Sequence, residues 1–105
     1  KTKKMVMEKS LENTSIEDVK KTTSDVVVFG NGDTFQLISK ASSKSQGWMK
    51  SCKAMEIYEV GCVVQVTTEF RNPDGTISCA EALTFVPDVK IGEDEKGKHL
   101  RSIHI

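Results

Sequence analysis

The residues with the clearest chemical potential lie between positions 40 and 53, where four lysines surround the only tryptophan of the chain and no acidic residue opposes them. A single-stranded nucleic acid is held by cations that neutralise its phosphates and by flat aromatic faces on which its bases stack. A solvated loop whose tryptophan anchors the core is the plainer interpretation of the same pattern. As one functional alternative we therefore predict a nucleic-acid site formed by Lys40, Lys44, Trp48, Lys50 and Lys53.

Three cysteines and two histidines are the other residues that could serve catalysis or bind a metal. The thiols of Cys52, Cys62 and Cys79 lack the close paired spacing of zinc sites, and both histidines lie near the C-terminus. Nothing in the sequence places a base beside a thiol. We therefore predict no catalytic residue, no metal site, no cofactor and no small-molecule substrate, and hence no enzyme.

Charge and length restrict the classes of partner. Fifteen basic and fifteen acidic residues cancel, which argues against a dedicated binder of duplex DNA or of a membrane surface. No apolar run is long enough to span a bilayer. An odd, sparse set of cysteines favours reduced thiols, so we expect a cytoplasmic protein. The 105 residues predict a flexible basic arm over 1–14 and a single β-rich domain over 15–105.

Two tight-turn sequences predict the hairpins whose strands would position the candidate residues. The first, Asn31-Gly32, lies between residues 25–29 and 34–38, in which apolar residues alternate with others, and suits a type I′ hairpin turn. The predicted hairpin has one wholly apolar face and a second, mixed face. The apolar residues of that mixed face are Val27, Phe29 and Ile38. They are the predicted surface for a protein partner.

The second turn, Asn72-Pro73-Asp74-Gly75, predicts a hairpin of residues 62–70 and 76–86. With Pro73-Asp74 as the central pair, Phe70 faces Ile77. A three-residue loop with a bulge at Gly75 would instead place Phe70 opposite Ser78. Burial of an apolar face favours the first register.

Glu81 fits the favoured register poorly, because it would lie on the apolar face opposite Val66. A buried carboxylate has a raised pKa and can act in proton transfer. A bulge, a strand end or a lysine partner such as Lys53 would explain it without any such role. We expect one of these structural explanations.

The remaining elements complete the fold prediction. Ser15 and the acidic residues after it predict a short helix from about Ile16 to Thr22. Residues 48–58 fit a strand or a helix, and we favour the strand. The fold class is mainly β, a small antiparallel β-barrel or open sandwich of five to six strands built from hairpins, with one short N-terminal helix. Closing the sheet into a barrel would prevent its long edge strands, rich in β-branched residues, from pairing with other chains.

Two stretches resemble small, uncharacterised proteins of tailed bacteriophages, namely residues 26–33 with 47–51, and residues 61–68 continuing to 82–87. The similarity covers roughly Asp25 to Ile91 and carries no assigned functional residue. It implies a protein made in an infected bacterial cytoplasm that binds nucleic acid or a host protein. We therefore predict a protein-interaction module that docks on a host protein or self-assembles, with single-stranded nucleic-acid binding as the alternative.

Overall fold

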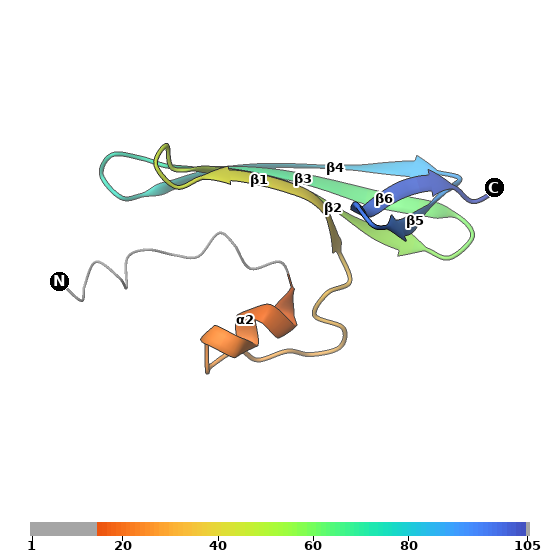
Figure 1. The fold of residues 1–105 in the computed structure, drawn as a ribbon, viewed down its shortest axis with the longest axis horizontal. Helices are drawn as coiled ribbons and strands as arrows, with labels where there is room; N and C mark the ends of the chain where they lie inside the picture. Colours follow the sequence, from red (N-terminus) through yellow and green to blue (C-terminus); the bar gives the residue numbers. More distant parts are fainter. Residues whose placement is uncertain (1–14, 105) are drawn as a thin grey trace. The chain divides into compact units, whose positions relative to one another are not determined.

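The computed structural model describes residues 15–104, which contain one short helix and six strands, so the chain is mainly β as predicted (Figure 1). The helix is α2 (Ile16–Thr22), and the strands are β1 (Gln36–Ser43), β2 (Trp48–Ile57), β3 (Gly61–Arg71), β4 (Ile77–Pro87), β5 (Val89–Asp94) and β6 (Gly97–Ser102). The predicted flexible arm over 1–14 lies outside the described residues.

The strands form two antiparallel sheets. One sheet has four strands in the order β1-β2-β3-β4, and the other pairs β5 with β6. Among the described residues β1 and β4 do not pair with each other, so the larger sheet is open rather than closed into a barrel. All six strands lie in one compact unit that begins at residue 33, whereas α2 belongs to a separate unit.

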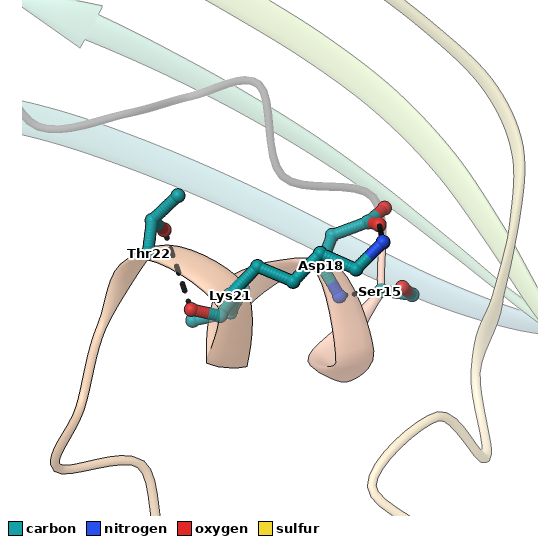
Figure 2. A network of polar contacts seen from close by, with 5 residues as sticks. Ser15, Asp18, Lys21 and Thr22 are labelled. Carbon is teal, nitrogen blue, oxygen red and sulfur yellow. Dashed lines mark hydrogen bonds and ion pairs between the residues drawn. The ribbon is translucent and has the colours of Figure 1, made fainter.

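Local capping explains why α2 begins and ends where the sequence predicts. The Oγ atom of Ser15 accepts a hydrogen bond from the backbone N–H of Asp18 at 3.1 Å, as Figure 2 shows. Acidic side chains occupy the first turn and lysines the last, which suits the helix dipole. Lys21 lies 3.8 Å from Asp18, so the two ends of this seven-residue helix also attract each other.

The prediction of a hairpin at Asn31-Gly32 is wrong. Residues 26–29 form no strand, and neither Asn31 nor Gly32 has the positive φ that a type I′ turn requires. Gly32 instead lies against α2, because a Cβ at this position would come within 2.8 Å of Ile16 Cγ1. The absence of a side chain at Gly32 therefore permits close packing against Ile16.

The partner of β1 is β2. The turn between them ends at Gly47, whose φ is +72° and whose N–H donates to the carbonyl oxygen of Ser43 at 2.8 Å. The polar segment at 44–47 is thus the tight reversal, and residues 48–57 are a strand as favoured.

The β3–β4 hairpin forms where predicted, but its favoured register is wrong. Phe70 faces Ser78, which is the pairing of the alternative three-residue loop. The N–H of Asn72 donates to Thr76 O at 2.7 Å, and the N–H of Gly75 donates to Asn72 O at 2.9 Å. Gly75 has a φ of +90°, as the bulge requires. Because β4 is exposed everywhere except Val86, no buried face outweighs the loop geometry.

The two fully buried side chains of the described sheet lie on the face onto which the β5–β6 hairpin packs, whereas Met49, which is 9% exposed, lies on the other face. Ala54 and Cys62 are fully buried. The Cys62 thiol donates to Val89 O at 3.7 Å, and the N–H of Ile91 donates to Glu56 Oε1 at 2.9 Å. Figure 1 shows β5 and β6 at the end of the sheet where β2 joins β3. One end of one sheet face is therefore covered by this hairpin.

Candidate interaction surface

Side chains alternate across the four-stranded sheet and divide it into two faces. Cross-strand pairing places Glu56 beside Cys62, and both contact β5. The face that carries these two residues is called the hairpin face, and it contains the even-numbered residues of β2, β3 and β4. The odd-numbered residues of the same strands form the opposite face.

The structure separates the five residues of the predicted nucleic-acid site. Trp48 and Lys50 lie on the hairpin face. Lys53 lies on the opposite face, and so does Lys40, which pairs with Ser51. Lys44 lies in the β1–β2 turn. The sheet therefore does not gather these lysines around one face of the indole.

The indole of Trp48 already has local partners. Its Nε1–H donates to Gln46 Oε1 at 2.8 Å, and Lys50 Nζ lies 5.8 Å from the ring centroid. Phe70, which is 48% exposed, lies across the strand pair from it. Strands β1–β3 also leave a shallow hollow of about 330 Å³ whose walls include Lys40, Lys50 and Cys52 but not Trp48. These contacts fix the ring on the sheet without forming a continuous basic groove.

The three residues of the predicted protein surface have different environments. Val27 and Phe29 are 92% and 101% exposed but lie outside any strand. Ile38 is half-buried in β1, at the point where the register shifts between Leu37 and Ser39. The hairpin that was expected to align them does not form, and their binding role stays a prediction.

Strand β4 is the exposed feature that the sequence interpretation missed. It is eleven residues long and pairs with β3 without a register shift. No strand among residues 15–104 pairs with its other side, which is called the β4 edge. Three large apolar side chains on the strand are exposed, by 38%, 60% and 47%: Ile77, Leu83 and Phe85. Their alternation is visible in the sequence, but it predicted burial under the favoured register.

The hydrogen-bond pattern shows which backbone groups of β4 point outward. Asn72 bonds to Thr76 across the hairpin, so pairs two residues apart, such as Phe70 with Ser78, also exchange hydrogen bonds. The even-numbered residues of β4 thus bond to β3. The odd-numbered residues direct their N–H and C=O groups toward the β4 edge, and of these only Pro87 lacks an N–H.

The two edges of the sheet differ in how they are protected. Strand β1 has a register shift between Leu37 and Ser39, and polar side chains surround it, including Lys40 and Ser42. Irregularity and charge are the usual means by which an edge strand avoids pairing with another chain. Strand β4 has no such shift, and Glu81 is its one charged residue.

Two side chains on β4 could be considered for chemistry, Glu81 and Cys79. Glu81 faces Thr67, whose hydroxyl lies 3.3 Å from Glu81 Oε2, so the carboxylate is an exposed strand residue rather than a buried acid. Desolvation, followed by the charges of Glu69 and Glu81, raises the pKa of the exposed Cys79 thiol. A raised thiol pKa disfavours the thiolate that nucleophilic catalysis needs. Among residues 15–104 no cluster of side chains could hold a metal ion.

Comparison with known proteins identifies a family. The Lockin family model matches residues 6–103, nearly the whole chain. No curated protein and no solved structure matches the chain. Within the described part of the chain, no helix has the length and apolar character needed to cross a membrane.

Proposed function

We propose that this chain, which belongs to the Lockin family, is a non-enzymatic protein-interaction module that binds an extended strand along the β4 edge. The observation that supports the proposal is an eleven-residue edge strand, regular and largely apolar, whose outer side pairs with no strand among residues 15–104. Strand addition uses such an edge, since backbone hydrogen bonds give affinity and alternate side chains give specificity.

The side chains beside the outward backbone groups suit an apolar partner. Ile77, Leu83 and Phe85 are odd-numbered, so they lie on the opposite face at the positions that would bond to an added strand. A strand docked here would cover part of each side chain as it pairs with the backbone. Backbone pairing and apolar burial would then act at the same positions.

The placement of the basic residues makes nucleic-acid binding the weaker candidate. Lys40 and Lys53 lie on the opposite face from Trp48, and Lys50 is held beside the indole ring. A nucleic-acid strand that stacked on Trp48 would meet few of the predicted cations. Strand binding at the β4 edge does not require basic residues to lie on one face.

The resemblance to small proteins of tailed bacteriophages belongs to the proposal as well. Under it, the partner strand would come from a bacterial host protein or from another copy of this chain, and the chain would act in the host cytoplasm. The three cysteines are free thiols, which is typical of a reduced compartment.

Selection of short random peptides on the immobilised chain tests the β4 edge. Leu83→Pro removes an outward N–H while leaving every β3–β4 bond in place, so selected peptides should bind it at least about tenfold more weakly, a change of about 1.4 kcal/mol. Leu83→Ala is the matched control, since it keeps the N–H and loses only the side chain. Circular dichroism confirms folding of both variants. Peptides that bind Leu83→Pro as well as the unaltered chain would contradict the proposal.

A further inference from the structure

We propose that the strand which occupies the β4 edge is β4 of a second copy, paired antiparallel about a two-fold axis at Ala82. The inference rests on the proposed function and names its partner. It predicts a dimer in which the two four-stranded sheets join into one continuous sheet. Symmetric pairs of this kind are the commonest form of self-association among soluble proteins.

Strand length selects Ala82 as the centre. Strand β4 runs from Ile77 to Pro87, and Ala82 is its middle residue. An axis at Ala82 pairs Ile77 with Pro87 of the second copy and uses the whole strand. An axis at any other residue leaves one end of each strand unpaired.

Charge supports the same register. Glu81 is the one charged residue of β4. About Ala82 it faces Leu83 of the second copy, whereas an axis at Glu81 would place two carboxylates directly opposite each other, which is destabilising. An axis at Ala82 therefore uses the full strand and keeps the two Glu81 carboxylates diagonal to each other rather than directly opposite.

Side-chain size fits the close approach at the axis. Ala82 and Ala80 lie on the hairpin face and bond inward to β3, so in the dimer they occupy non-hydrogen-bonded pairs, where side chains come closest. Ala82 faces its own copy, and Ala80 faces Thr84 of the second copy. On the opposite face, the exposed Leu83 side chains of the two copies are diagonal neighbours across the axis.

The number of backbone bonds is sufficient for a specific interface. The outward groups from Ile77 to Pro87 would form about ten inter-chain hydrogen bonds, the number in a typical protein–protein interface. The large apolar side chains that are now exposed on β4 would lie beside these bonds.

Disulfide cross-linking tests the register. In a Cys52→Ser/Cys79→Ser background, Ala82→Cys faces its own copy and should form a disulfide-linked dimer under mild oxidation. Ala80→Cys is the matched control, because it lies on the same strand and face but meets Thr84. It should remain monomeric alone and cross-link when mixed with a Thr84→Cys chain. Non-reducing electrophoresis and sedimentation velocity give the readouts.

Each other outcome overturns the inference in a recognisable way. If Ala82→Cys remains monomeric, or cross-links no better than Ala80→Cys, β4 does not pair with itself in this register. If Ala82→Cys cross-links to a Val27→Cys chain instead, the exposed residues 26–29 of another copy are the occupant. Selected peptides that bind the unaltered chain but not Leu83→Pro would then still support the proposed function without self-pairing.

Discussion

The thiol of Cys62 donates a hydrogen bond to the carbonyl oxygen of Val89 across 3.7 Å, and this contact joins the two sheets. Cys62 is also the largest fully buried side chain of the described residues. Beside it, Glu56 Oε1 accepts from the N–H of Ile91 at 2.9 Å. The β5–β6 hairpin thus contacts the sheet through one thiol and one carboxylate.

Cys62→Ala should lower the free energy of unfolding by about 1–2 kcal/mol, because it removes a buried sulfur atom and a donor to Val89. Urea denaturation followed by circular dichroism measures the change. Cys79→Ala is the control at an exposed position and should stay within about 0.5 kcal/mol of the unaltered chain. Equal effects of the two substitutions would contradict the role of Cys62 in joining the sheets.

Alkaline pH should weaken the fold through the same residue. Burial, and to a lesser degree the charge of Glu56, raises the pKa of the Cys62 thiol above its ordinary value. The folded state therefore holds this proton to higher pH than the unfolded chain does. The contribution of Cys62 is complete below the ordinary thiol pKa and is lost as pH rises toward the raised value. Denaturation midpoints across this range should fall less steeply in Cys62→Ala, and parallel slopes would refute the assignment.

Thr67 lies opposite Glu81, which provides a direct test of the β3–β4 register. Thr67→Lys should add about 0.2–1 kcal/mol of stability by placing an ammonium group opposite the carboxylate. The gain should vanish when Glu81→Gln is combined with it. Gln65→Lys, which faces Leu83, is the matched control and should show no gain. A gain at Gln65 but not at Thr67 would show that the strands pair differently.

Single-stranded oligonucleotide should leave the fluorescence of Trp48 nearly unchanged at physiological salt, since Lys40 and Lys53 lie on the opposite face of the sheet and only Lys50 shares the face of the indole. Titration with oligothymidylate measures this. Saturable quenching that is lost in Lys50→Gln but kept in Lys53→Gln would instead show that a base stacks on the hairpin face. The pair is informative because the two lysines lie on opposite faces of the same strand.

Local signals in the sequence predicted the elements that local contacts determine. The capping residue Ser15 predicted both ends of α2 correctly, and the Asn72-Pro73-Asp74-Gly75 turn predicted the position of the β3–β4 hairpin. Both depend on hydrogen bonds between residues at most four positions apart. The sequence around each of them therefore contained the necessary information.

Strand pairing and register, which depend on residues far apart in the sequence, were not predictable from local signals. Asn31-Gly32 has the composition of a hairpin turn, but packing of Gly32 against Ile16 and pairing of β1 with β2 override it. The register of β4 was inferred from an assumed buried face, and this strand has none. The β4 edge was not predicted for the same reason. An alternating apolar pattern does not distinguish a strand that packs on a core from an exposed edge strand.

Amide hydrogen exchange along β4 tests the central claim most directly. Ala80, Ala82 and Thr84 bond to β3 and should be protected at every protein concentration, whereas Cys79, Glu81 and Leu83 face the β4 edge. In dilute solution these outward amides should exchange rapidly, and their protection should rise with concentration as a partner strand adds. Outward amides that exchange rapidly at all concentrations, and with selected peptides present, would show that the β4 edge binds no strand.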